Sequence, residues 1–226
     1  MAQSRRQFLA QALGPGIVTE EQQNTLKINP TLKIVQVGDA GLRSQGRQLS
    51  VKQVRSKEIQ QLIEWMRHTM NDAPGVGLAA PQVGLPFQLA VIEDKREYMQ
   101  DIPVEILKER ERQPVSFHVI VNPRITSSGS RIVTFFEGCL SLNGFVALVP
   151  RSSQVTVECL DHRGKPQIIH ASGWHARILQ HEISHLTGEL YIDRMISRSF
   201  STVESFNRNW KTKAIAEVQQ SLDLKR

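Results

Sequence analysis

Apolar residues recur along this chain with two periods, one typical of helices and one typical of strands. From Lys57 to Asn71 they fall every three or four residues, which predicts an amphipathic helix whose apolar stripe belongs to the core. The same spacing over 173–187 predicts a second helix, which Gly188 could end in a left-handed conformation. A third helix is expected over 202–226.

Shorter apolar runs predict strands. Residues 88–92 and 118–121 have the continuous apolar pattern of buried strands, and Asn122-Pro123 is expected to end the second one. Further strands are expected at 130–136, 147–149, 154–160, 167–170 and 190–192. Because strands and helices do not alternate in order, we expect an α+β fold with mainly antiparallel sheets packed around the second predicted helix.

Composition limits the class of protein. With 226 residues, of which 40% are hydrophobic and 22% charged, the chain fits a soluble protein with one sizeable core. We expect the main domain at 31–200, an N-terminal extension at 1–30 and a C-terminal helical tail at 201–226. Within the domain, the charged segment 94–116 is expected to be a surface excursion with a short helix around 104–112.

Charge and hydropathy argue against two kinds of partner. No apolar run has the length needed to span a membrane, so no membrane partner is expected. The net charge of +6 favours solubility, and no sequence-specific nucleic-acid partner is expected. Arg5-Arg6 superficially resembles part of an export signal, but the apolar stretch after it is too short; an organelle-targeting remnant and a loosely packed extension stay open.

The residues that carry chemistry begin with the run His181-Glu182-Ile183-Ser184-His185. On a helix, positions four apart share a face, so His181 and His185 can present two imidazole nitrogens to one metal ion. Glu182 is placed to act as a base for a water molecule that the metal activates. The alternative is a surface helix that carries two histidines by chance, but the flanking apolar residues place the run inside a helix and favour a metal site.

The two cysteines differ in context. Cys139 follows a Glu-Gly step and precedes Leu-Ser, a bend where a side chain can be aimed at a ligand, whereas Cys159 lies in an alternating strand pattern that indicates the core. A lone cysteine is more often a small buried residue than a ligand. A thiolate from Cys139 would nevertheless complete three protein ligands and leave a fourth position open, as in catalytic sites. Two cysteines imply no disulfide framework and fit a reducing compartment.

A glycine-rich loop precedes the predicted strand at 88–92. Gly75 and Gly77 allow backbone to run close to a ligand, because no β-carbon blocks the approach. Gln82 follows Pro81 on a rigid turn, so its amide N–H could donate to a developing oxyanion. Taken alone, this segment is better explained as a helix-to-strand loop in which glycine and proline merely turn the chain.

Three segments stand in the order and approximate spacing of the motifs of peptide deformylases: Gly75-Val76-Gly77-Leu78-Ala79-Ala80-Pro81-Gln82, Glu137-Gly138-Cys139-Leu140-Ser141 and His181-Glu182-Ile183-Ser184-His185. The chain resembles this family from about Leu32 to about Phe200. The stretches 135–141 and 171–174, with the long segment 94–116, resemble the subtype found in mitochondria, plants and some bacteria.

The resemblance implies an enzyme that hydrolyses the N-formyl group from the initiator methionine of nascent polypeptides and releases formate. It implies that Cys139, His181 and His185 bind one divalent metal ion, Fe²⁺ first, with Zn²⁺, Ni²⁺ or Co²⁺ as alternatives. In such an enzyme Glu182 would carry the proton from the attacking water to the leaving amine.

The same resemblance assigns roles around the substrate. Gln82 and the backbone N–H of Leu140 would stabilise the oxyanion of the tetrahedral intermediate. Gly75 and Gly77 would admit the peptide in an extended conformation.

Two positions depart from the family pattern. Ser184 stands where the family usually has Asp, and Val146 stands where many bacterial members have a substrate-binding Arg. We expect Arg151 to pair with Glu137 and to lack the second acidic partner that an Asp at position 184 would supply, at a cost to metal affinity or activity.

Two other interpretations follow from these features. A general zinc metallopeptidase shares the His-Glu-x-x-His motif, and a catalytically weak or silent relative could act as a peptide- or ribosome-binding module. Some family members are thought to touch the ribosome through a C-terminal helix, which makes the tail at 202–226 a weak candidate for that contact. The expected compartment is the bacterial cytoplasm, or the matrix of a mitochondrion or plastid in a eukaryote.

The remaining histidines lack a partner at ligand spacing, so we expect them to be structural or exposed. They are His68, His118, His162, His170 and His175.

Overall fold

The computed structural model describes residues 31–224, so the expected extension at 1–30 lies outside the described residues. The helices are α3 (Val51–Val54), α4 (Lys57–Asp72), α5 (Val104–Glu109), α6 (Gly173–Leu186), α7 (Val203–Asn209) and α8 (Ile215–Ser221). The strands are β1 (Gly77–Ala79), β2 (Leu89–Asp94), β3 (Val115–Ser128), β4 (Ile132–Gly138), β5 (Phe145–Ser152), β6 (Gln154–Leu160), β7 (Pro166–Ser172) and β8 (Ser201–Thr202). Short 3-10 turns lie at Ala40–Arg43, Ala80–Val83, Arg96–Met99, Tyr191–Asp193 and Ser197–Ser199.

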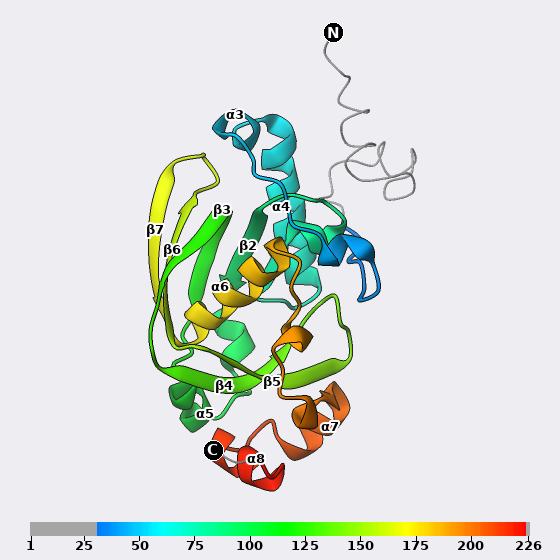
Figure 1. The fold of residues 1–226 in the computed structure, drawn as a ribbon, viewed down its shortest axis with the longest axis vertical. Helices are drawn as coiled ribbons and strands as arrows, with labels where there is room; N and C mark the ends of the chain where they lie inside the picture. The colour runs from blue at the N-terminus through cyan, green and yellow to red at the C-terminus, as the bar shows by residue number, and fades with distance from the viewer. Residues whose placement is uncertain (1–30, 225–226) are drawn as a thin grey trace.

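Two antiparallel sheets enclose one helix. The larger sheet has the order β1-β2-β3-β6-β7, and the smaller one has the order β4-β5-β8. Helix α6 runs across the middle of the molecule and contacts strands of both sheets (Figure 1). The predicted α+β class, with mainly antiparallel sheets around this helix, is confirmed. Over the described residues, no helix combines the length and the apolarity that crossing a membrane would require.

Helix α4 forms as its apolar spacing predicted. The Ser56 side chain accepts a hydrogen bond from the backbone N–H of Ile59 and so satisfies one of the free amides at the helix start. The apolar stripe of α4, which includes Met66 and Met70, is fully buried in a cluster with residues of β1, β2 and β3. This packing fixes the glycine-rich loop that follows the helix.

Helix α6 is held at the centre by apolar contacts with the larger sheet. Ala176, Leu179 and Leu186 are buried against residues of β1, β2, β3, β6 and β7. The helix ends where the sequence indicated, because Gly188 adopts φ +80° and a β-carbon there would lie 2.6 Å from the carbonyl oxygen of Arg43. The end of α6 is thereby held against the backbone of Arg43.

Strand β3 does not stop at Asn122-Pro123, so that prediction was wrong. The pairing register shifts between Val121 and Arg124, and Asn122 has φ +49°, which together form a bulge. The Asn122 side chain accepts from the backbone N–H of Leu49 and donates to its carbonyl, at 2.9 and 2.8 Å. Proline has no N–H to lose at a bulge, so the strand continues beyond it.

Two further predictions need correction. Residues 190–192 do not form a strand: Asp193 accepts from the backbone N–H of Leu190 and closes a 3-10 turn instead. The tail is two short helices, α7 and α8, rather than one. Their apolar residues, which include Phe206 and Val218, pack against Phe136 of the smaller sheet.

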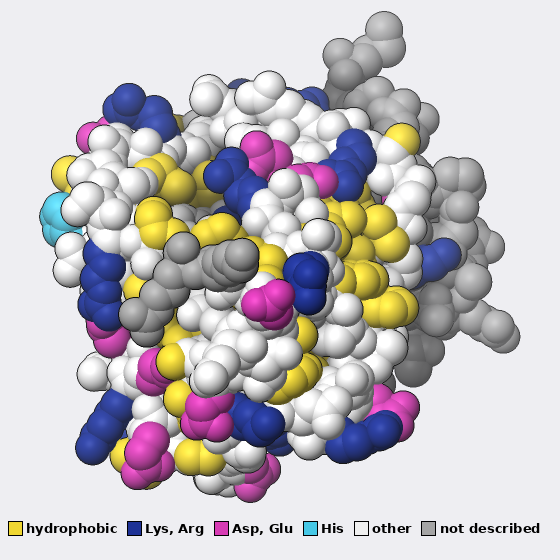
Figure 2. Space-filling model, turned by 60° about the horizontal axis from the view of Figure 1, so that its bottom comes forward, with side chains coloured by type: hydrophobic (Ala, Val, Ile, Leu, Met, Phe, Trp, Pro, Cys, Tyr) yellow, Lys and Arg dark blue, Asp and Glu magenta, His cyan; other side chains and the backbone are white. Residues whose placement is uncertain are grey.

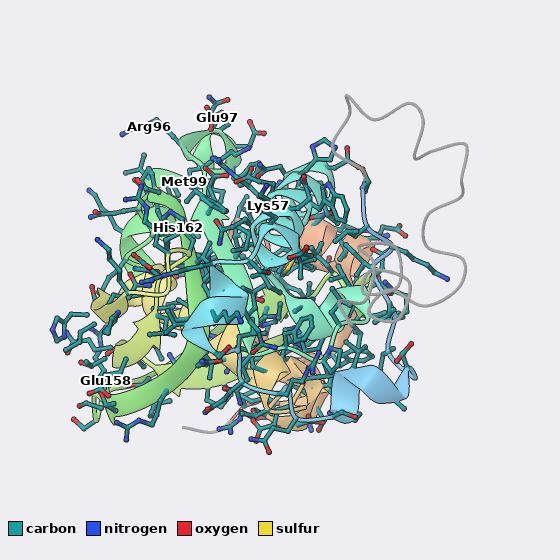
Figure 3. All side chains as sticks on the ribbon, turned by 90° about the horizontal axis from the view of Figure 1, so that it is seen from above. Lys57, Arg96, Glu97, Met99, Glu158 and His162 are labelled. Atoms are coloured by element: carbon teal, nitrogen blue, oxygen red, sulfur yellow. The ribbon has the colours of Figure 1, made fainter. Side chains whose placement is uncertain are left out.

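The charged segment after β2 is the expected surface excursion with a short helix, α5. Arg96 and Glu97 lie in its 3-10 turn and point outward at the rim of the molecule (Figure 3).

Candidate metal centre

Cys139, His181 and His185 come together at one point. Their ligand atoms all lie within 4.8 Å of one another, and among residues 31–224 this is the one group of three or more such side chains. Cys139 Sγ is 3.2 Å from Nε2 of His185, which is 3.3 Å from Nε2 of His181. Cys139 directly follows β4, while both histidines lie on the face of α6 turned toward it. The structure therefore brings together the three residues that the sequence singled out.

Glu137 fixes the orientation of His181. Its Oε2 lies 2.9 Å from Nδ1 of His181, which leaves Nε2 directed at the other two ligand atoms. A carboxylate behind a histidine ligand is the usual arrangement in metalloproteins, because it sets the tautomer and increases ligand basicity. Burial alone would raise the pKa of Glu137, but Arg151 and His181 outweigh it and hold this pKa well below its ordinary value.

Two arginines hold Glu137 in place. Arg151 donates to both carboxylate oxygens, at 2.7 and 2.9 Å, so the expected ion pair is confirmed. Arg177 donates to Oε1 of Glu137 at 2.6 Å and to the carbonyl oxygens of Val149 and Val133, at 2.9 and 2.7 Å. Arg177 thus joins α6 to β4 and β5 directly behind the ligands.

Our interpretation of the sequence missed Arg177. The signal was present, because Arg177 is a charged residue in an otherwise apolar helical stretch and lies four positions before His181. Positions four apart share a helix face. A buried cation on the ligand face needs an anionic partner, and Glu137 was the acid nearest to Cys139 in the sequence.

The chemistry of the cluster fits a divalent transition metal. Thiolate and imidazole donors suit Zn²⁺ or Fe²⁺, and burial lowers the pKa of His185, which favours the neutral imidazole that binds metals. Among the described residues, Nδ1 of His185 and Oε2 of Glu182 are buried polar atoms without a hydrogen-bond partner. Unsatisfied polar atoms are rare in interiors, and those next to a donor cluster indicate a functional site.

Glu182 is buried next to the ligands, with 3% of its surface exposed. Burial is the largest influence on its carboxyl group and raises its pKa to about 7, although the nearby His181 and Arg151 oppose the shift. A β-carbon on Gly77 would lie 2.1 Å from Oε1 of Glu182. Gly77 therefore makes room for the Glu182 carboxylate, a role that the sequence did not suggest.

Gln82 also points at the cluster. Its Oε1 accepts from the backbone N–H of Ala79 at 2.8 Å, and its Nε2 lies 3.4 Å from Sγ of Cys139. The side chain is 1% exposed, so this orientation is fixed by the surrounding backbone. Leu140 is half-buried beside Cys139, and a β-carbon on Gly75 would lie 2.8 Å from the end of the Leu140 side chain.

Ser184 and Val146, the two positions that depart from the motif pattern, lie in different surroundings. Ser184 Oγ donates to the carbonyl of Gln180 at 2.8 Å and lies 3.4 Å from a guanidinium nitrogen of Arg151, so it reaches the arginine without neutralising it. Val146 is buried against the C-terminal helices. Because strand residues alternate between faces, Val146 lies on the face of β5 opposite to Ala147, which packs near Cys139.

The remaining histidines lie outside the cluster. His162 is in the turn between β6 and β7, as expected (Figure 3). His118 and His175, however, are partners: their Nε2 atoms are 3.4 Å apart. Sequence spacing could not reveal this contact between β3 and α6.

Comparison with known proteins agrees with this geometry. The family model described as Polypeptide deformylase matches residues 31–201. The chain belongs to the peptide deformylase family. It is 45% identical over 174 residues to the chloroplastic peptide deformylase 1A of Solanum lycopersicum, and 40% identical over 174 residues to the mitochondrial peptide deformylase of Homo sapiens.

The coverage of these relatives is unequal. The match to the Solanum enzyme includes 77% of this chain and 63% of the relative, so the chain spans less than two thirds of that protein. For peptide deformylase 3 of Streptomyces avermitilis, 40% identical over 193 residues, the shares are 85% and 84%. A Met-Ala-Ser-bound crystal structure of the class I type b peptide deformylase from Acinetobacter baumannii has a TM-score of 0.66 at 29% identity and covers 74% of this chain and 100% of its own.

Proposed function

We propose that this protein is a metal-dependent hydrolase that removes the N-formyl group from formylmethionyl peptides and releases formate. The observation that carries the proposal is the buried cluster of Cys139, His181 and His185, with Glu182 beside it, in a chain of the peptide deformylase family.

Cys139, His181 and His185 would hold the metal ion, and the fit of their donor atoms supports this assignment. A divalent metal at this position would polarise the formyl carbonyl and lower the pKa of a coordinated water molecule. Thiolate and imidazole ligands suit Fe²⁺ and Zn²⁺ alike. Fe²⁺ is our first candidate for the native ion because the family resemblance implies it, and Zn²⁺, Ni²⁺ and Co²⁺ are the alternatives.

Glu182 would act as the general base and then as the general acid. A pKa raised to about 7 by burial lets this carboxyl group both accept and release a proton near neutral pH. It would take the proton of the attacking water and deliver it to the nitrogen of the methionine as the C–N bond breaks. Gly77 keeps the space that the carboxylate needs.

Gln82 and the backbone N–H of Leu140 would stabilise the oxyanion. The Gln82 amide is oriented by Ala79 and already directs its N–H group at the cluster. Because its carboxamide is buried and held, little reorganisation is needed when charge develops on the substrate oxygen. One such donor contributes roughly 3 kcal/mol in comparable sites.

Two strand edges offer a route for an extended peptide. Strand β1 is an edge of the larger sheet and β4 is an edge of the smaller one. β1 begins at Gly77, and β4 ends one residue before Cys139. An extended substrate could therefore pair with free backbone groups beside the metal centre, with Gly75 and Gly77 allowing close approach.

Ser184 does not favour the silent alternative. The ion pairs that hold Glu137 against His181 are complete without an acid at position 184. We therefore expect an active enzyme.

The deciding experiment is formate release from formyl-Met-Ala by anaerobically purified protein loaded separately with Fe²⁺, Ni²⁺ or Zn²⁺. Glu182→Gln is the matched control, since it keeps the shape of the side chain but removes the base. We expect turnover in the wild type and a loss of roughly 10²- to 10⁴-fold in the variant, with metal content unchanged. Stoichiometric metal without formate release would overturn the proposal.

Contact with the ribosome is a weaker proposal. Most apolar residues of the tail that the structure describes pack against the smaller sheet, and its exposed charges, which include Arg208, Lys211 and Lys213, are the candidates for such a contact. Lys211→Glu/Lys213→Glu should reduce co-sedimentation with ribosomes without exposing the sheet; equal co-sedimentation would remove the idea. For the compartment, we propose the bacterial cytoplasm or an organelle matrix.

A further inference from the structure

Two aromatic side chains are stacked on the surface close to the metal centre. Phe145 and Phe200 are 39% and 41% exposed, and their rings lie 5.1 Å apart with only 8° between their planes. Phe145 begins β5, and Phe200 directly precedes β8. Since Phe145 pairs with Thr202, the two phenylalanines are diagonal neighbours on one face of the smaller sheet.

That face is the one that carries the metal ligands. On β5, Ala147 and Val149 belong to the apolar cluster against which Cys139 packs, and Arg151 binds Glu137. Phe145 lies two residues before Ala147, so its side chain is on the same face of the strand. The register of β4 with β5 pairs Gly138 with Val146, so the next pair along would be Cys139 and Phe145. Cys139 and Phe145 therefore each adjoin the last pair of β4 and β5, Gly138 with Val146.

Single exposed apolar residues are common and need no explanation. Phe145 and Phe200 differ because they contact each other and lie beside the candidate reaction centre. Asn143 and Gly144, which precede Phe145 in the turn, are also exposed. The view in Figure 2, which brings forward the end of the molecule that carries β4 and β5, shows hydrophobic side chains gathered in groups at the surface.

We propose that Phe145 and Phe200 form an aromatic ledge that binds an apolar side chain at the third or fourth residue of the formylated peptide. The proposal rests on the proposed function. An extended peptide advances ~3.3 Å per residue, so the third and fourth residues lie roughly 7–10 Å beyond the formylmethionine. The ledge lies on the same face of the smaller sheet as Cys139, so a peptide that leaves the metal centre across this face, rather than along the free edge of β4, would meet it. It would make the enzyme more selective for downstream sequence than hydrolysis of the formyl group requires.

Formyl-Met-Ala-Ser-Ser, formyl-Met-Ala-Phe-Ser and formyl-Met-Ala-Ser-Phe test the ledge. The metal-loaded wild type should prefer one of the phenylalanine peptides by roughly 3- to 10-fold in kcat/KM, mainly through KM, the range expected of one aromatic contact. Phe145→Ala and Phe200→Ala should each reduce this ratio toward one. Ile132→Ala is the matched control, because Ile132 is 60% exposed at the far end of β4, and it should keep the preference.

Failures of the two proposals are distinguishable. A wild type that hydrolyses formyl-Met-Ala-Ser-Ser but shows no preference among the three peptides would overturn the ledge alone. So would a preference that survives in Phe145→Ala and Phe200→Ala, since the selectivity would then come from another surface. Absence of formate from all three peptides with metal bound would overturn the proposed function and the ledge with it.

Discussion

Helix α6 contributes to two pairs of histidines that have nearly the same geometry. His181 and His185 have their Nε2 atoms 3.3 Å apart and their ring planes at 76°. Near the start of the helix, His175 and His118 have their Nε2 atoms 3.4 Å apart and their planes at 81°. Distance alone does not distinguish a metal centre from a packed pair.

The neighbours distinguish them. Cys139 and Glu137 supply a thiol and a carboxylate to the pair of His181 and His185. In the other pair, Nδ1 of His118 lies 2.9 Å from the carbonyl oxygen of Ser116. Burial disfavours the charged form of His181, but hydrogen bonds with Cys139 and Glu137 outweigh it and raise its pKa to about 10. Burial, aided by His118, lowers the pKa of His175 to about 4. An anionic environment therefore distinguishes the candidate metal centre from the pair of His118 and His175.

The strongest test of this comparison removes one histidine from each pair. His185→Ala should lose the metal and all formate release, because two ligands cannot hold the ion in a catalytic geometry. His175→Ala should retain one metal ion per chain and its turnover. Metal content by mass spectrometry, measured beside formate release, decides the point. Two ions in the wild type and one in His175→Ala would show that the second pair also binds metal.

A second test concerns Glu182, the proposed general base, which has no counterpart near His118 and His175. Gly77→Ala should lower kcat by about 10²-fold without loss of metal, because the new methyl group would overlap the Glu182 carboxylate and displace it. Gly129→Ala is the matched control, because Gly129 joins β3 to β4 and a β-carbon there would approach no atom more closely than Cβ of Gln154, at 3.3 Å. Equal losses in kcat for both variants would argue against a specific role for Gly77.

The clustering of the candidate ligands was easier to predict from the sequence than their surroundings. His181, Glu182 and His185 were predictable because helical spacing alone places them on one side of α6, and the resemblance supplied Cys139. Arg177 was missed because its partner Glu137 lies forty residues earlier, on another element. The pairing of His118 with His175 was missed for the same reason: contacts between a strand and a helix leave no periodic signal in the chain.

Local patterns also failed where side chains changed the backbone. Asn122-Pro123 has the composition of a stop, yet the hydrogen bonds from Asn122 to Leu49 turn it into a bulge inside β3. Leu190 to Ile192 has the apolar pattern of a strand, yet the Asp193 side chain closes a 3-10 turn there. In both cases a single side-chain contact outweighs the propensity of the segment.

A third test changes the charge behind the metal ligands. Arg151 and Arg177 share the single carboxylate of Glu137, so these three side chains together carry one more positive than negative charge. Ser184→Asp would place a carboxylate near Arg151 and should raise metal affinity about tenfold. Ser184→Asn has nearly the same shape without the charge and should not. Competition with a metal chelator measures both variants, and equal affinities in Ser184→Asp and the wild type would contradict the argument.

The smallest expected effect concerns the pair of His118 and His175, and it is a pH dependence of the free energy of unfolding. His175 has a pKa of about 4 in the folded chain, against an ordinary value near 6.5. Above that ordinary value the side chain is neutral in both states. Between the two values only the unfolded chain takes up the proton, so the free energy of unfolding falls as the pH falls.

His175→Asn should therefore lose less stability than the wild type between about pH 7 and about pH 5. Because His175 is partly exposed and its surroundings are screened, we expect a difference of only about 1 kcal/mol, or about 2–4 °C in Tm. The pKa of His118 is also lowered, by burial, so His118→Asn should change the slope in the same direction. Thermal melts at both pH values measure the effect. Identical losses in Tm for wild type and His175→Asn would mean that this pair is not buried in its neutral form, and the contrast with the metal centre would then rest on the ligands alone.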